Sequence, residues 1–235
     1  MTPLRQDLPS SLYWLTERVQ SLVKPAAFFS ADSAQVSPLG GTRAWGTPDL
    51  PADAPWAGAA RRADRNRSPE DGPAFSLQLN LQDIPERVRN PAWPVVGVVW
   101  VFVDWRPGRW CTTVEFDPRP AADIPWLAGT EKGQPAAQWR LDETLPWCTP
   151  MTLPDVWNGP PQCCSDYDDW MREHYSDRRR GDCFVGGWVL PVQGDMDDSN
   201  EDFVCALENR FFGDAGAVYL HYTPEKGFYA LAETH

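Results

Sequence analysis

The chain has 235 residues, of which 42% are hydrophobic and 23% are charged, so it can bury a sizeable core and is not expected to be disordered. Residues 1–120 carry 13 acidic and 13 basic side chains, whereas residues 121–235 carry 20 and 8 and supply the whole formal charge of −12. Such a field repels phosphate, which argues against nucleic acid and anionic membranes as partners, and it attracts a cationic protein or a metal ion. The alternative is that the acidity only keeps the chain soluble.

The N-terminal sequence lacks the apolar run of a signal peptide, and no stretch approaches the roughly 20 apolar residues that cross a bilayer. We therefore expect a soluble cytoplasmic protein. Six cysteines in a chain of this length fit that compartment better than a secreted disulfide scaffold.

The first half predicts one helix followed by strands. Apolar residues recur at helical spacing between Leu12 and Val23, and Pro25 would end that helix. A short strand is expected at 26–30, followed by a segment rich in glycine, proline and tryptophan and a polar, turn-rich loop at 57–72.

Three further strands are expected in this half. Residues 74–81 alternate as a half-buried strand does, and residues 95–105 form a nearly continuous β-branched and aromatic run, typical of a central strand buried on both faces. Residues 110–116 are its expected hairpin partner, joined through Pro107 and Gly108.

The second half predicts an irregular connecting segment over 121–183 that contains one helix near 165–176, with Ser165 as its cap. Three short strands close the chain, in the segments FVCALE, AVYLHY and GFYALA.

Two parts of the chain share a pattern, which lies within residues 26–120 and again within 184–232. Each part has a pair of glycines, then a β segment that begins with phenylalanine (Phe75 or Phe203), then an apolar segment led by glycine (Gly97 or Gly216). We interpret residues 1–235 as one α+β domain, mostly antiparallel β, in which two related sheets share one core.

Five segments, in order, resemble the YwqG-like family of uncharacterised bacterial proteins: KPAAFFS, SPLGG, FSLQLNLQDIP, GGWVLPVQGD and FFGDAGAVYLHY. The resemblance implies a mostly antiparallel β fold with a duplicated core and an N-terminal helix, and it implies no established enzymatic activity. The chain departs from the family at Ala206, where the pattern favours the glutamine that Gln78 supplies in the first half, and over residues 131–182, which match poorly.

An acidic stretch, QGDMDDSNEDF, puts five carboxylates into the eight residues from Asp195 to Asp202. Counted as a calcium loop of the EF-hand type, it has Asn200 where glycine is needed and Ala206 where the bidentate glutamate is needed. An exposed acidic loop is therefore the expectation, and an irregular oxygen-ligand site is the alternative.

The cysteines do not show the paired spacing of a zinc site, so we expect Cys148, Cys163, Cys164 and Cys183 to be free thiols and predict no metal and no cofactor. No nucleophile elbow, phosphate-binding loop, zincin motif or dinucleotide fingerprint is present. The sequence therefore favours a binding protein over an enzyme and supplies no catalytic residue.

Several glycines are expected to shape turns, and one aspartate can bond its own backbone in such a turn. These residues are Gly40, Gly41, Gly186, Gly187, Gly213, Asp214 and Gly216. One alternative function is a small-molecule or carbohydrate binder or hydrolase with a pocket between the two halves, near the two glycine pairs. Trp45, Trp56 and Trp188 are the candidate sugar platforms.

The leading hypothesis is an intracellular, non-catalytic protein of the immunity type, which docks a basic protein, such as a toxin, through its acidic second half. Its expected contact residues are Asp195, Asp197, Asp198, Glu201 and Asp202, supported by Asp166, Asp168 and Asp169.

Overall fold

The computed structural model describes ten ranges of the chain: 10–15, 23–30, 36–57, 73–106, 109–127, 137–144, 162–175, 183–189, 202–208 and 216–234. Its strands are β1 (Lys24–Ser30), β2 (Arg43–Ala44), β3 (Ala74–Asn80), β4 (Val98–Arg106), β5 (Arg109–Asp117), β6 (Gln138–Thr144), β7 (Cys183–Gly186), β8 (Phe203–Glu208), β9 (Gly216–Thr223) and β10 (Gly227–Thr234). Its helices are the α-helix α3 (Gln162–Tyr175) and the short 3₁₀ helices η2 (Ser10–Leu15), η4 (Leu81–Asp83), η5 (Glu86–Val88) and η6 (Ala121–Asp123).

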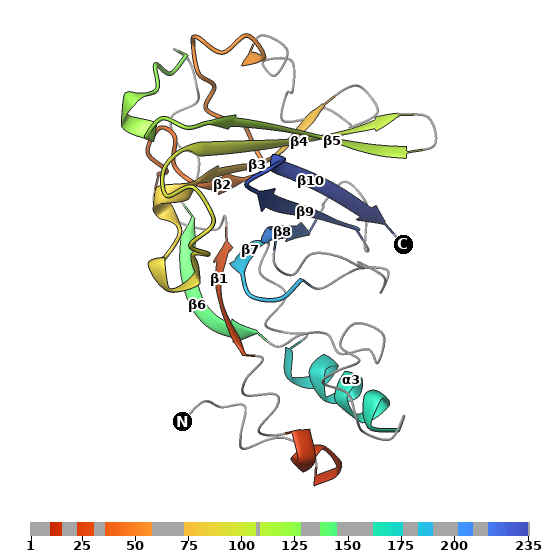
Figure 1. Cartoon of the computed structure of the whole chain (residues 1–235). Coiled ribbons are helices and arrows are strands. Elements are labelled where there is room, and N and C mark those ends of the chain that lie inside the picture. The colour runs from red at the N-terminus through yellow and green to blue at the C-terminus, as the bar shows by residue number, and fades with distance from the viewer. Residues whose placement is uncertain are drawn as a thin grey trace.

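The fold is mostly antiparallel β. One sheet has four strands in the order β2-β3-β4-β5, and the other has six in the order β10-β9-β8-β7-β1-β6. Every strand pairing in the described part of the chain is antiparallel. Figure 1 shows the four-stranded sheet lying across the β9–β10 hairpin, with α3 and η2 together at the opposite end of the molecule.

The two sheets share one apolar core. Val99, Val101 and Val103 of β4 belong to the same buried cluster as Leu207 of β8 and Leu220 of β9. Side chains alternate along a strand, so the intervening residues of β4 face the other way. Each fully buried aliphatic side chain of this kind contributes about 1.5–3 kcal/mol to folding.

The outer face of the four-stranded sheet is also covered. Val98, Trp100 and Phe102 pack under the segments 50–57 and 121–127, where the Trp56 ring lies 5.1 Å from the Trp100 ring. The expectation of a central strand buried on both faces is therefore confirmed for β4. The expectation of a half-buried strand is wrong for β3, whose seven residues are all buried, because these segments cover the face that alternation assigned to solvent.

The two sheets contain meanders with the same pairing. In β3–β4, Phe75 pairs with Phe102 and Leu77 with Val101, with a bulge between Phe75 and Leu77. In β8–β9, Phe203 pairs with His221 and Cys205 with Leu220, with a bulge between Phe203 and Cys205. The glycine-led segments that share a sequence pattern therefore occupy the same places in β4 and β9.

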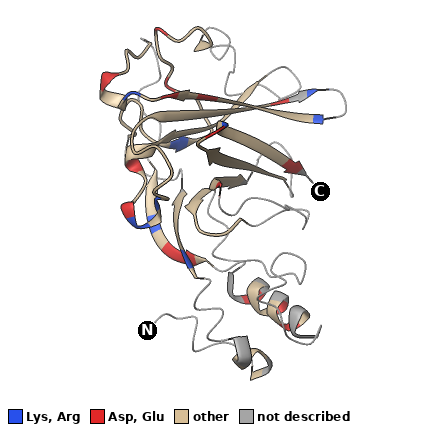
Figure 2. Cartoon of the chain, viewed as in Figure 1, with Lys and Arg blue, Asp and Glu red and all other residues tan. Residues whose placement is uncertain are grey.

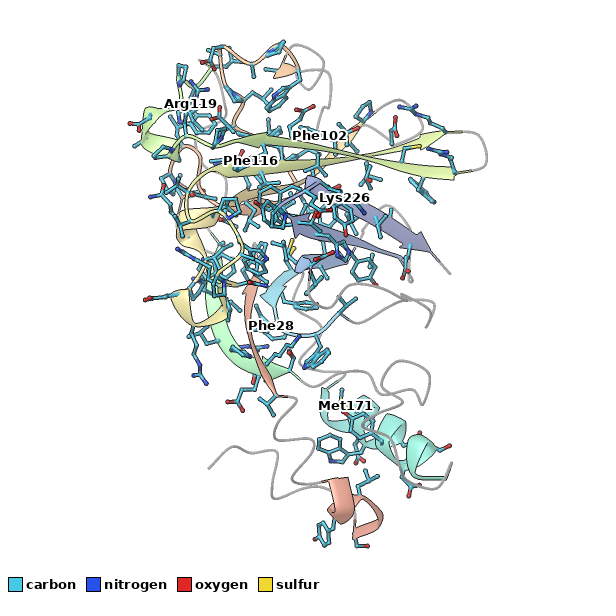
Figure 3. All side chains as sticks on the ribbon, in the orientation of Figure 1. Phe28, Phe102, Phe116, Arg119, Met171 and Lys226 are labelled. Atoms are coloured by element: carbon cyan, nitrogen blue, oxygen red, sulfur yellow. The ribbon has the colours of Figure 1, made fainter. Side chains whose placement is uncertain are left out.

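The edges of the two sheets meet along β5 and β10. The Thr112 hydroxyl donates to the Ala230 carbonyl, and the Phe116 ring lies 4.9 Å from the Phe228 ring. Figure 3 shows Phe116 on β5 beside this junction. Contact here is through side chains, so the two sheets close against each other without a backbone ladder between them.

The helical predictions are met in part. Helix α3 is present, but it begins at Gln162, so Ser165 lies in its first turn rather than at the cap. The N-terminal helix expected from Leu12 to Val23 is not shown: residues 10–15 form the 3₁₀ helix η2, and residues 16–22 lie outside the described part. No helix among the described residues is both long and apolar enough to span a bilayer.

The segment 121–183, which we expected to be irregular apart from one helix, also contains a strand, so that prediction is wrong there. This strand is β6, which pairs with β1 through seven consecutive residues from Lys24–Thr144 to Ser30–Gln138. Sequence patterns missed β6 because it is an edge strand with four charged residues or glutamines in seven, so neither an apolar run nor clean alternation marks it.

Candidate functional site

The solvent-facing side of α3 is acidic. Asp166 is half-buried and Asp169 and Glu173 are exposed, and spacings of three and seven residues put these carboxylates along one side of the helix. The neighbouring side buries Tyr167 and Met171, which are 0% and 1% exposed.

This apolar side fixes which way α3 faces. Trp170 is 4% exposed and its ring lies 6.0 Å from the Tyr167 ring. Helix α3 contacts η2, whose Leu12 is fully buried, and Figure 3 shows Met171 on the side of α3 toward η2. With that side packed, the acidic side faces solvent. Figure 2 marks the acidic residues of α3 in red.

The structure places three of the eight predicted contact carboxylates. Asp166 and Asp169 lie together on α3, whereas Asp202 lies immediately before β8 and does not belong to that helix. Asp168 is within α3, but its side chain is outside the described part of the structure. Asp195, Asp197, Asp198 and Glu201 lie outside the described residues.

Asp202 stands beside a buried histidine. Its backbone carbonyl accepts a hydrogen bond from the Tyr222 amide at 2.7 Å, and its carboxylate accepts one from the Tyr229 hydroxyl at 3.5 Å. His221 is fully buried and its ring stacks on that of Tyr229, with centroids 5.2 Å apart. Phe203 also packs against the same imidazole, with ring centroids 6.0 Å apart.

Burial governs the protonation of this histidine. It lowers the pKa of His221 to about 4, and the nearby Asp202 charge opposes the shift without cancelling it. The imidazole is therefore neutral at pH 7 and packs as an aromatic side chain.

A buried charged cluster, which the sequence patterns did not reveal, lies under the first sheet's covering segment. Arg43, Asp49 and Gln78 are 5%, 1% and 0% exposed. The Arg43 guanidinium donates to the Asp49 carboxylate. The same carboxylate oxygen accepts the Gly40 amide at 2.7 Å and the Gln78 side-chain amide at 3.2 Å.

Gln78 connects this cluster to the sheet. Its side-chain oxygen accepts from the Asp49 amide at 2.8 Å and from the Trp100 indole at 3.0 Å, and its nitrogen donates to the Gly41 carbonyl at 2.8 Å. The Trp100 indole also donates to the Asp49 carbonyl at 2.8 Å. These bonds fasten residues 40–49 to β3 and β4.

This cluster has a structural role. Burial lowers the pKa of the Arg43 guanidinium, and the Asp49 charge counteracts that effect. Three donors converge on one carboxylate oxygen, so the Asp49 carboxylate is enclosed by protein donors rather than presented to a ligand. The sequence signal was Gln78, an amide side chain within a mostly apolar β segment, which needs partners if the strand is buried.

Two of the predicted turn glycines stand where a side chain would collide with the protein. Gly40 has φ +74°, and a Cβ there would lie 2.5 Å from the Trp126 ring. Gly187 has φ +76°, and a Cβ would lie 2.4 Å from the Thr144 hydroxyl. Protein atoms therefore fill the space beside both glycines, where the alternative pocket was expected.

The other turn residues are placed as follows. Gly41 donates its amide to the Pro38 carbonyl at 3.0 Å, Gly186 ends β7 and Gly216 begins β9. Gly213 and Asp214 lie outside the described residues.

Arg119 forms a second charged group at the surface. It donates to Asp53 at 2.7 and 3.0 Å and also pairs with Asp117, and these hydrogen bonds raise the pKa of the Arg119 guanidinium and lower those of both carboxyls. The pairing ties the segment at 51–57 to the end of β5, as Figure 3 indicates by the position of Arg119.

The candidate tryptophans and thiols take packing roles where the structure describes them. Trp188 is 8% exposed with the Lys24 ammonium 3.8 Å from its ring, and Trp56 packs on Trp100. Cys205 is fully buried, and burial raises the pKa of its thiol. Cys183 is also buried, while the side chains of Cys148, Cys163 and Cys164 lie outside the described part. Among described residues no group of three potential metal ligands converges.

Comparison with known protein families and with curated proteins finds no match for this chain. The resemblance to the YwqG-like family stays a prediction.

Proposed function

We propose that this protein is a non-catalytic binding protein that docks a basic protein partner through acidic surface on its second half, in the manner of an immunity protein. The observation that carries the proposal is the acidic side of α3, where Asp166, Asp169 and Glu173 share one solvent-facing stripe. We call these three residues the α3 stripe.

Charge distribution supports a basic partner. Residues 121–235 supply the whole formal charge of −12, and the α3 stripe is part of that region. A surface of one sign raises the rate of association with an oppositely charged protein and suppresses association with phosphate-rich partners.

The packing of α3 supports docking rather than solubility alone. A helix that binds through fixed charges must be held in one orientation, and Tyr167, Trp170 and Met171 are buried to 0, 4 and 1% exposure. Carboxylates on a helix that is already packed in one orientation lose less conformational entropy on binding than carboxylates on an unrestrained segment. Each contact therefore contributes more to the binding free energy.

The test compares two triple charge reversals with the same change in net charge. One is Asp166→Lys/Asp169→Lys/Glu173→Lys on the stripe. Its matched control is Glu86→Lys/Asp123→Lys/Glu225→Lys, which reverses three exposed carboxylates on η5, η6 and the β9–β10 turn. Circular dichroism first establishes that both variants fold.

Affinity capture from the native host, followed by titration of the captured protein against each variant, gives the result. We expect the wild type and the control to bind one basic protein with salt-sensitive affinity, and the stripe variant to bind at least about tenfold more weakly. If that partner is a toxin, co-expression of the wild type, but not of the stripe variant, restores growth. Equal binding by both variants, or capture of no basic protein, would contradict the proposal.

A further inference from the structure

The four edges of the two sheets differ in how they end. Strand β2 is two residues long, and short edge strands offer little backbone for pairing. Strands β5 and β10 close against each other through the Thr112–Ala230 hydrogen bond and the Phe116–Phe228 contact. The remaining edge strand, β6, is not short, and among the described residues no other strand closes against its outer edge.

Strand β6 has the features of a pairing edge. It is seven residues long and pairs with β1 in unbroken register, with no bulge and no proline. Natural proteins discourage pairing at an exposed edge with bulges, prolines, shortness and charged side chains. Strand β6 lacks the first three, and its charges are of both signs, so a strand with complementary charges can pair with it.

Its side chains are arranged around a central exposed leucine. Trp139 is anchored inward, with its ring 4.9 Å from that of Phe29. Leu141, two residues on and therefore on the same face, is 49% exposed. Arg140 and Asp142 flank Leu141 on the other face of the strand, with opposite charges one on each side.

We infer that β6 pairs antiparallel with β6 of a second copy of this chain, in the register that puts Leu141 opposite Leu141. In that register each Arg140 lies opposite Asp142 of the other copy, so one contact forms twice about a two-fold axis. The two exposed leucines meet on the opposite face, and the two six-stranded sheets become one continuous sheet.

Self-complementarity singles out a second copy as the occupant. An antiparallel pair centred on one residue sets position i−1 of each strand against position i+1 of the other, and in β6 these two positions carry an arginine and an aspartate. An unrelated strand would have to supply a matching pattern of its own. This inference is independent of the proposed function, because α3 takes no part in it.

Sedimentation equilibrium and native mass spectrometry of the full chain provide the test. We expect the wild type to be dimeric at about 100 µM. Arg140→Asp places two carboxylates opposite each other at both contacts, and Asp142→Arg places two guanidinium groups there, so each single variant should dissociate at least about tenfold more readily.

Mixing the two single variants distinguishes pairing across copies from effects within one chain. An Arg140→Asp copy presents two acidic positions and an Asp142→Arg copy presents two basic ones, so a one-to-one mixture should form a heterodimer although each variant alone does not. The control mixture combines Glu225→Arg with Lys226→Asp, which makes equivalent charge changes in the β9–β10 turn; both of these variants should self-associate as the wild type does.

Three outcomes would overturn the inference. They are a wild type that stays monomeric over this concentration range, single variants that dimerise as the wild type does, and a mixture of the two single variants that yields no heterodimer. The α3 stripe variant should remain dimeric, so a failure of the proposed function and a failure of this inference are separable.

Discussion

The meanders β2-β3-β4-β5 and β7-β8-β9-β10 have the same strand order, and their central pairs have the same register and the same bulge. Their outward-facing residues nevertheless differ. Gln78 pairs with Trp100 in the first, whereas Ala206 pairs with Tyr219 in the second.

The same backbone pairing is therefore compatible with different side chains on the outer face of each sheet. The inward residues of both meanders are mostly aliphatic, and they form one core. The outer face of the first is fastened by buried charges and amides under residues 40–57, and the outer face of the second is apolar and aromatic, with Phe203, Ala206 and Tyr219 in one buried cluster. The same strand pairing therefore carries a polar, hydrogen-bonded outer face in one sheet and an apolar outer face in the other.

The largest effect we predict tests the charged fastening of the first meander. Asp49→Ala leaves the Arg43 guanidinium buried without its counter-charge, and it removes the acceptor of the Gly40 amide. Breaking a buried ion pair in this way should lower the free energy of unfolding by about 3–5 kcal/mol. Urea denaturation followed by tryptophan fluorescence measures the change.

Asp53→Ala is the matched control, because Asp53 also pairs with an arginine, Arg119, but is 48% exposed. It should leave the unfolding midpoint close to that of the wild type, since exposed ion pairs contribute little. Equal losses for the two variants would show that burial of the Arg43–Asp49 pair is not what makes it matter.

The sequence predicted the parts of this fold whose pattern is set locally. Strands β4, β8, β9 and β10 are runs of β-branched, aromatic and small apolar residues, and α3 buries residues at helical spacing, so periodicity was sufficient. The sequence pointed to Asp166 and Asp169 of the α3 stripe as contact residues, but not to Glu173.

What the sequence did not predict depends on contacts between distant segments. Strand β3 alternates, yet both its faces are buried because residues 50–57 and 121–127 cover one of them. The partners of Gln78 lie 29 and 37 residues away along the chain at Asp49 and Gly41. Strand β6 has a polar composition because it is an edge, and its pairing with β1 joins residues more than a hundred positions apart.

The second prediction concerns a position where one meander has a titratable side chain and the other does not. His221 occupies in β9 the place that Phe102 occupies in β4. Burial holds the pKa of His221 at about 4, below its ordinary value of 6.5. Because the unfolded chain binds this proton more readily, stability is fully present above about pH 6.5, falls as the pH drops, and reaches a loss of roughly 3 kcal/mol below pH 4.

His221→Phe gives the second meander the residue of the first and should remove this loss. The wild type and the variant are compared by urea denaturation at several values between pH 7 and about pH 4, because other carboxylates titrate in the same range and only the difference reports on His221. Tyr229→Phe, which keeps the stacked ring, should retain the wild-type dependence. Parallel curves for the wild type and His221→Phe would show that His221 does not carry the effect.

The smallest effect we predict lies where the two meanders meet. Thr112→Val removes the hydroxyl that donates to the Ala230 carbonyl while keeping the shape of the side chain, so it should cost about 1 kcal/mol in urea denaturation. Thr113→Val, on the exposed face of the same strand, should cost nothing measurable, since valine suits a strand at least as well as threonine. Equal stability of the two variants would mean that the Thr112 bond does not join the edges. A measured loss for Thr112→Val alone would show that a side-chain hydrogen bond holds β5 against β10, where no backbone ladder joins the two sheets.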